Sequence, residues 1–227
     1  MAEAAVRRDE SSNRGEDARR RLVDAALEVF GAHGFDGAST RILAEKAGVN
    51  LAAIPYYFGG KEGLYRATAE YIVEASNREL APVMTKINSA LAAARRPTRQ
   101  VAAALLRDLL ERFSWLLIGS GQAERWSNFV MREQMQPGAA FEILYSGIMR
   151  PVTFTCARLL GVLFQRSADD PRIAIRAQSI LGQVLIFRVS HRTALRHMGW
   201  KEFSAERVKL IQSVVFADVD RIIAAGK

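Results

Sequence analysis

The chain has 227 residues and a formal net charge of +8, with 32 Lys and Arg against 24 Asp and Glu. Hydrophobic residues make up 49% of it, which is typical of a folded globular protein and excludes an extended disordered one. The single cysteine excludes an intramolecular disulfide framework and a cysteine-based zinc site, and it favours a cytoplasmic protein. No run reaches the ~18 uninterrupted apolar residues of a membrane span, so we expect no membrane partner.

The N-terminal residues 1–14 are polar and of mixed charge, and they predict a flexible arm. The arm lacks the apolar core of a signal peptide. Its arginines could reach a DNA minor groove, although a solvated tail explains the same composition. Residues 1–62 hold 9 Lys and Arg against 10 Asp and Glu, so the positive surplus lies in residues 63–227. The net charge therefore does not locate a nucleic-acid site.

Apolar residues recur at three- and four-residue steps along most of the chain and predict an all-α fold. Leu22, Ala26 and Phe30 form such a stripe in a first helix, which Gly34 should end. We expect prolines, including Pro82, to mark helix ends. In chain order, the predicted helices span residues 17–33, 40–47, 51–58, 61–80, 83–94, 98–118, 123–135, 139–164, 172–198 and 204–225.

The segment from Ser39 to Lys61 predicts two short helices joined by a tight turn at Gly48, where a glycine permits a left-handed backbone. Asn50 is a suitable N-cap for the second of these helices. Such a unit can rest one helix on the DNA backbone and place the other in the major groove. On the first helix we expect the inward-facing residues to be Ile42, Leu43 and Ala47.

Three sequence segments, FGAHGFDGAST, RILAEKAGVNLAAIPYYFGGK and the EGLY that follows them, resemble the TetR family of bacterial one-component regulators. NFVMREQMQPGAAFEILYSGIMRPV and ILGQVLIFRVSHRTALRHMGW are similar to its CecR-like subgroup. The resemblance implies an N-terminal three-helix helix-turn-helix domain over residues 15–62. It implies a larger helical ligand-binding and dimerisation domain over residues 63–227. The implied partners are a double-stranded DNA operator, an unknown small-molecule effector and a second copy of the chain, with no cofactor.

The recognition helix, residues 51–58, contains no Arg and no Lys, so it cannot supply the bidentate arginine–guanine pair. Hydroxyl and cationic side chains would then hold phosphates, while Arg41 and small or amide side chains would meet base edges. For Lys61, an ordinary solvated helix position is the alternative. The candidate DNA-binding residues are Thr40, Arg41, Asn50, Leu51, Ala52, Ala53, Tyr56, Tyr57 and Lys61.

Pro55 departs from the family pattern inside the recognition helix. Proline lacks the amide that would bond back to the carbonyl of Leu51, so we expect this helix to be short or kinked. A tolerated irregularity and an adaptation to one operator both explain such a residue.

The middle helices carry large aromatic residues and a few polar ones, the make-up of a ligand pocket, although a plain core has the same composition. The candidate pocket residues are Phe113, Trp115, Trp126, Phe129, Arg132, Tyr145, Met149 and His191. The helix predicted over residues 172–198 is apolar on more than one face and must be buried on several sides, in the core or against a partner. The resemblance favours a dimer interface, with candidates Ile180, Gly182, Leu185 and Val189.

Catalytic signatures are missing from the sequence. The chain has 3 histidines, and His191 and His197 are poorly spaced for one metal on one helical face. There is no nucleophile elbow, phosphate loop or HExxH, so we expect no enzyme and no metal site. For Cys156, a buried core position and a redox switch are the two readings.

We expect a ligand-responsive transcriptional regulator, in particular a repressor released from a palindromic operator by a small molecule. One DNA-binding unit makes too few contacts for useful specificity, so a dimer reading two half-sites is a functional requirement. The alternative is a helical ligand-binding adaptor that has lost DNA binding.

Overall fold

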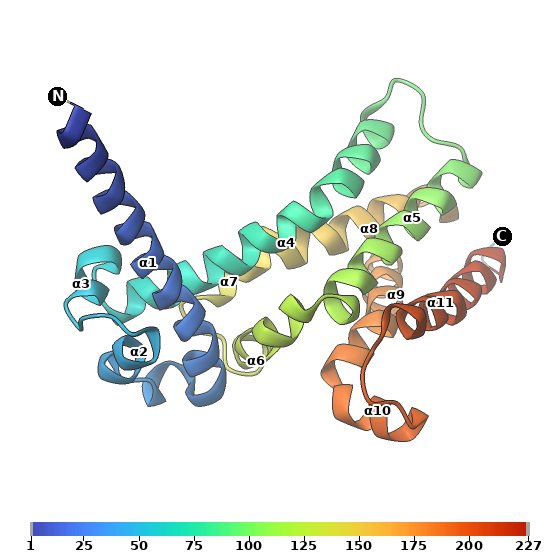
Figure 1. Cartoon of the computed structure of the whole chain (residues 1–227). Helices are drawn as coiled ribbons and strands as arrows, with labels where there is room; N and C mark the ends of the chain where they lie inside the picture. The colour runs from blue at the N-terminus through green and yellow to red at the C-terminus, as the bar shows by residue number, and fades with distance from the viewer. Residues whose placement is uncertain (1, 226–227) are drawn as a thin grey trace. The chain divides into compact units, whose positions relative to one another are not determined.

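A computed structural model describes the backbone of residues 2–225 and the side chains of residues 15–121 and 124–225. All regular elements among those residues are helices (Figure 1), which confirms the predicted all-α fold. The chain forms two compact units, residues 1–73 with 125–144 and residues 74–124 with 145–227. Two helices, α4 (Lys61–Ala92) and α6 (Gly121–Met135), contribute residues to both units.

The first unit has an aromatic core. The Tyr65 ring lies edge-on to Phe30 and Phe35, with centroids 4.8 and 5.1 Å apart, and tilted against Phe129 at 4.8 Å. Because Tyr65 and Phe129 complete this core, the unit extends beyond the expected domain 15–62. Besides its parts of α4 and α6, it contains α1 (Ala2–Gly37), α2 (Thr40–Ala47), α3 (Ala53–Phe58) and α7 (Phe141–Leu144).

Helix α1 is interrupted at Gly34, whose φ of 73° and ψ of −179° are non-helical, as expected for the glycine that ends a helix. Towards the N-terminus the backbone is helical from Ala2, which differs from the flexible arm predicted over residues 1–14. Residues 2–13 contain neither Gly nor Pro, the residues that most disfavour a helix. The side chains of these residues lie outside the described part of the chain.

Helix α4 continues through Pro82, so the predicted helix end at this proline is wrong. Proline removes the amide that would bond to the carbonyl of Arg78. Both residues are exposed, and water can therefore bind the carbonyl that loses its partner. The cost of the proline is small enough for the helix to continue.

The second unit is built around four helices whose inner residues are buried. Arg99 connects its own helix to two others, since its guanidinium donates to the carbonyl of Leu163 on one of them and of Ile223 on the other. The segment Phe141–Phe164 has the length and mean hydropathy of a membrane span, but Leu159 and Leu160 are fully buried in the protein, and core packing explains its composition. Besides its parts of α4 and α6, the unit contains α5 (Arg99–Ser114), η1 (Trp115–Gly119), η2 (Tyr145–Met149), α8 (Arg150–Phe164), α9 (Pro171–Val189), α10 (His191–Met198) and α11 (Ala205–Ala225).

Three of the long predicted helices are interrupted. The helices expected over residues 98–118 and 139–164 contain the π-helices η1 and η2, which apolar periodicity does not reveal. The single helix predicted over residues 172–198 is wrong, because α9 and α10 meet at Ser190 with a bend of 80°. Ser190 has non-helical backbone angles, and its hydroxyl donates to the carbonyl of Ile186 at 2.7 Å.

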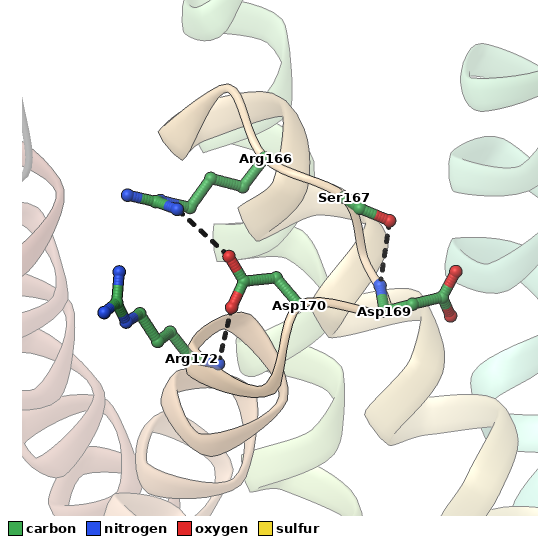
Figure 2. Close-up of polar contacts among 5 residues, drawn as sticks. All are labelled: Arg166, Ser167, Asp169, Asp170 and Arg172. Carbon is green, nitrogen blue, oxygen red and sulfur yellow. Dashed lines mark hydrogen bonds and ion pairs between the residues drawn. The ribbon is translucent and has the colours of Figure 1, made fainter.

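The loop between α8 and α9 is held by Asp170, the N-cap of α9. One carboxylate oxygen accepts from the backbone amide of Arg172 at 2.8 Å, and the other accepts from Arg166 Nη1 at 3.1 Å (Figure 2). The hydroxyl of Ser167 accepts from the amide of Asp169 at 3.2 Å. The Arg172 amide, and after it the Arg166 guanidinium, hold the pKa of the Asp170 carboxyl below its usual value.

We predict that Asp170→Asn destabilises the protein at neutral pH and has less effect in acid. The asparagine keeps an acceptor for the Arg172 amide but loses the negative charge. A lowered folded-state pKa gives stability that is present above the unfolded value of about 3.9 and is lost as pH falls through the folded value. Denaturant unfolding of both proteins from pH 7 to pH 3 should show their difference shrinking below about pH 4. A difference that does not change with pH would contradict this role of the charge.

Candidate DNA-binding and ligand-binding sites

The turn between α2 and α3 is fixed by Gly48, whose φ of 63° and ψ of 40° are left-handed, as predicted. The amide of Gly48 donates to the carbonyl of Glu45 at 3.1 Å, and Arg21 Nη1 of α1 donates to the carbonyl of Gly48 at 3.3 Å. At the other end of α2, the hydroxyl of Ser39 accepts from the amide of Ile42 at 3.2 Å. Helix α1 and the two caps therefore hold α2 and its turn in place.

The recognition helix α3 is shorter than the predicted 51–58, because residues 50–52 form a turn before it. Within that turn Asn50 Oδ1 accepts from the amide of Ala52 at 2.9 Å. Pro55 is the third residue of α3, where an amide has no partner within the helix, so the proline costs little. The carbonyl of Leu51 instead accepts from the amide of Ile54 at 3.3 Å. The expectation of a short helix is confirmed.

Several predicted DNA-binding residues are exposed in the helix-turn-helix unit. Tyr56 is 80% exposed and Leu51 is 51% exposed. The hydroxyl of Tyr57 lies near Gly15 of α1. A Cβ atom added to Gly15 would be 3.3 Å from this hydroxyl oxygen. The expectation that Ile42 faces inward is wrong, since α2 buries its next two residues and Ala47 instead. Arg41, Asn50 and Ala52 are exposed, and Thr40, Ala53, Tyr57 and Lys61 are half-buried.

Arg41 differs from the other cations between Ser39 and Lys61. Lys46 Nζ lies 2.9 Å from a carboxylate oxygen of Glu28. Lys61 Nζ donates to the carbonyl of Phe35 in α1 at 2.9 Å and to that of Ala38, just after α1, at 3.1 Å, so two of its three donors are used. The guanidinium of Arg41 is exposed and has no ion pair or hydrogen bond within the described part of the chain. Arg41 is therefore the cation of this segment that is best placed to meet an anion.

Residues 125–135 of α6 are bound to α1 within the first unit. Arg132 Nε and Nη2 donate to the carbonyls of Gly31 and Ala32 at 2.8 and 2.6 Å, where the end of a helix favours a cation. Arg125 pairs with Asp24 at 2.9 Å. Three candidate pocket residues, Trp126, Phe129 and Arg132, thus belong to this unit, and the partners of Phe129 and Arg132 there account for their positions.

A buried carboxylate also joins α4 to α6. Glu133 is 2% exposed, and its two oxygens accept from the hydroxyl of Tyr65 at 2.5 Å and from the amide of Gly138 at 3.0 Å. Burial and the neighbouring Glu133 raise the pKa of Tyr65 well above its ordinary range, so the phenol remains a donor. Sequence reasoning missed this pair because the two residues are far apart in the chain.

We predict that Tyr65→Phe lowers the free energy of unfolding by about 1–3 kcal/mol, because a buried carboxylate oxygen loses its donor while the ring packing remains. Thermal unfolding should shift downward by about 2–4 °C per kcal/mol. Tyr71→Phe is the matched control, since Tyr71 lies on the same helix and its hydroxyl has no hydrogen bond among the described residues. Equal effects of the two substitutions would show that the Glu133 bond is not the cause.

The other candidate pocket residues belong to the second unit. Trp115 is the first residue of η1, and Tyr145 and Met149 are the ends of η2. Trp115 is 37% and Tyr145 41% exposed, whereas Phe113 and Met149 are half-buried. Irregular π-helical turns are frequent at functional sites because they displace side chains from the regular helical pattern.

His191 and Cys156 also lie in the second unit. The imidazole of His191 lies 5.1 Å from the ring of Phe203, and burial together with Arg188 lowers its pKa. The thiol of Cys156 is fully buried, and burial raises its pKa to about 12. This agrees with a core position for Cys156, since reactive cysteines are exposed and acidic.

The candidate dimer residues of α9 differ in exposure. Ile180 is 1% exposed and lies in the core of the unit, whereas Val189 is 48% exposed. Leu185 is half-buried, and an added Cβ at Gly182 would meet nothing within 4 Å. Further exposed apolar residues lie on α9 and on α11, a helix that sequence reasoning did not place in the interface. We define the α9–α11 face by Ile175, Ile186, Val189, Leu210 and Val214.

Comparisons with known proteins match two parts of the chain. Residues 22–68 match the model for bacterial regulatory proteins of the tetR family, and residues 102–226 match the C-terminal domain of the HTH-type transcriptional dual regulator CecR. The CecR protein of Shigella flexneri is 31% identical over 210 residues, which cover 92% of this chain and 93% of that protein.

Two solved structures share the fold. FadR from Bacillus subtilis in complex with stearoyl-CoA has a TM-score of 0.55 and 17% identity, covering 92% of this chain and 98% of that one. AibR in complex with isovaleryl coenzyme A and operator DNA has a TM-score of 0.61 and 14% identity, covering 88% and 96%. At these identities the likeness shows the fold alone.

Proposed function

Because the chain belongs to the TetR family of bacterial regulators and has a CecR-type C-terminal domain, we propose that it is a repressor released from a palindromic operator by a small molecule. The family makes it a soluble, non-enzymatic, DNA-binding transcriptional regulator with a ligand-binding C-terminal domain, which implies the cytoplasm. Beyond the family assignment, we propose the repressor mode, the palindromic form of the operator and the residues that make each contact.

The exposed surface of α2 and α3 is the observation that supports DNA binding most directly. Arg41 has no ion pair or hydrogen bond among the described residues, and Tyr56 and Leu51 are more than half exposed. In the groove, Arg41 would hold a phosphate or a guanine edge, and the Tyr56 hydroxyl a phosphate. Lys61 would contribute the one donor that the carbonyls of Phe35 and Ala38 leave. Thr40, Asn50, Ala52, Ala53 and Tyr57 complete the proposed contacts.

We place the effector in the second unit, against the side chains that border its π-helices. Phe113, Trp115, Tyr145 and Met149 supply apolar walls, and His191 supplies a polar group. Trp126, Phe129 and Arg132 are left out of this pocket because they belong to the first unit, where the contacts of Phe129 and Arg132 explain their positions.

The α9–α11 face is the proposed contact with a second copy of the chain. Its exposed isoleucine, leucine and valine side chains lie on two helices that pack against each other. An isologous contact of this kind gives a two-fold dimer, and it would present two recognition helices to the two halves of a palindrome.

Release from DNA requires that the effector binds the DNA-incompetent conformation more tightly than the competent one. Helix α6 contributes residues to both units, so a shift of this helix at the effector would reach α1 through the contacts of Arg125 and Arg132. This helix is therefore the proposed physical link between effector binding and the position of α1.

A gel-shift titration with the DNA fragment upstream of the protein's own gene tests the proposal. We expect a shift that weakens with salt, together with a reporter that is more active when the regulator is deleted. The reporter should be able to detect a decrease in expression as well as an increase, because the similar Shigella protein is named a dual regulator. No shift, from a protein that is dimeric in solution, would favour the adaptor that has lost DNA binding.

A further inference from the structure

Arg188, near the end of α9, carries a charge that no carboxylate of the described residues pairs with. Its Nη1 makes one long hydrogen bond, 3.5 Å, to the carbonyl of Leu117 in η1. Its Nε is the one buried side-chain nitrogen or oxygen among the described residues that has no hydrogen-bond partner. Other arginines of this unit, Arg107 and Arg166 among them, are in ion pairs with aspartates.

A half-buried guanidinium without a paired carboxylate is unfavourable for the folded protein. Arginine stays protonated in proteins, so burial leaves a charge that has lost part of its hydration. Burial lowers the pKa of Arg188, and the negative charge of Glu124 offsets this only in part. No carboxylate of the described residues lies within ion-pair distance of this guanidinium. An anion that arrives from outside would remove the penalty.

Aromatic and basic groups lie near Arg188, together with the carboxylate of Glu124, which acts on it from beyond ion-pair distance. Arg188 lies close enough to His191 to lower its pKa, and the ring of His191 packs against Phe203 at 5.1 Å. Phe203 in turn meets Phe187 at 6.4 Å and Trp200 at 6.2 Å, both edge-on. This aromatic cluster lies where the chain bends by 80° between α9 and α10. The site therefore combines a planar cation with an apolar, aromatic wall.

We propose that Arg188 anchors the anionic group of the effector, and that the effector is a small organic anion with an aromatic body. The planar fork of a guanidinium pairs with carboxylate or phosphate oxygens through two parallel hydrogen bonds. The aromatic body would pack against the cluster of Phe187, Trp200 and Phe203. This inference rests on the proposed function, because it names the chemical class of the effector that would release the repressor.

Isothermal calorimetry on the full-length protein tests the site with three probes of one shape. Naphthalene-2-carboxylate and 2-naphthyl phosphate are anionic, and naphthalene-2-carboxamide is neutral. We expect at least one anion to bind more tightly than the amide, and Arg188→Gln to weaken that anion about 10-fold or more. Whether the carboxylate or the phosphate binds better identifies the headgroup. Arg196→Gln, which removes the same charge from an exposed position on α10, should leave binding unchanged.

Thermal unfolding of Arg188→Met without any probe provides a second readout. If the unpaired charge is kept for binding, its removal should raise the Tm of the ligand-free protein by a few degrees. A purely structural arginine would give a lower Tm. Arg188→Lys should keep part of the preference for the anion, since it keeps the charge without the planar fork.

Three results would overturn the proposal: no measurable binding of either anion, an amide that binds as tightly as both anions, or Arg188→Gln that keeps the wild-type preference. Calorimetry needs no DNA, so its outcome is independent of the gel shift. If operator binding fails while the anion preference holds, the repressor function is wrong and the anion site stands. If operator binding holds while the preference is absent, only the anion site is wrong.

Discussion

Replacing Arg41 by Gln should weaken operator binding of the dimer by about 100-fold. Each protomer would lose one hydrogen bond between a cation and a phosphate or base, about 1.5 kcal/mol, and a two-fold dimer loses it twice. Because Arg41 is exposed and makes no ion pair or hydrogen bond with the residues that the structure describes, the substitution should leave the Tm unchanged. Fluorescence anisotropy with a labelled operator fragment, repeated at several salt concentrations, measures the loss.

The salt dependence identifies what Arg41 touches. A phosphate contact should lower the slope of log K against log salt by about 1 for each protomer. A base contact should instead relax the preference for one base pair of each half-site. Lys46→Gln is the matched control, because Lys46 has the same charge on the same helix but is paired with Glu28. If both substitutions reduced the affinity equally, the assignment of Arg41 would be wrong.

Ile186→Asp should convert the dimer to monomers at micromolar concentration. The side chain is 51% exposed on the α9–α11 face, so the monomer tolerates a charge there. At a two-fold interface the aspartate appears twice, and each carboxylate without a partner costs several kcal/mol to bury. Operator affinity should fall with dimerisation, since separate half-site readers lose the gain from binding together.

Light scattering coupled to size-exclusion chromatography measures the mass of this variant directly. Val101→Asp is the control, because Val101 is an apolar residue of the same unit that is 44% exposed but lies on α5. We expect the control to remain dimeric and to bind the operator. A dimeric Ile186→Asp protein would place the interface away from the α9–α11 face.

Local signals account for the parts of the fold that sequence reasoning predicted. Gly48 and Ser39 act on backbone groups within a few residues of themselves, so the helix-turn-helix order follows from nearby chemistry. The N-cap at Thr98 has the same origin, with its hydroxyl accepting from the amide of Val101 at 3.3 Å. The bend at Ser190 and the π-helices were missed because the periodicity of apolar residues continues across them.

The surroundings of the candidate site residues could not be predicted from the sequence, for one physical reason. Arg132 and Phe129 have the residue types of a pocket, yet the partners of Arg132 are two carbonyls of α1 and that of Phe129 is the ring of Tyr65, all distant in sequence. The exposed Leu210 and Val214 cannot be distinguished by type from buried neighbours such as Val215. Residue type alone does not say which face of a helix another helix will cover.

The sequence by itself determined the all-α class, the helix-turn-helix and the family, because caps, turns and apolar periodicity depend on neighbouring residues. Only the tertiary structure decided which cations remain available, since Lys46 and Lys61 are engaged by groups at or near α1, whereas Arg41 has no such partner among the described residues. It also decided that Arg188 is half-buried, with an Nε that has no hydrogen-bond partner among the described residues. Burial and ion pairing arise between residues far apart in the chain, so no local pattern encodes them.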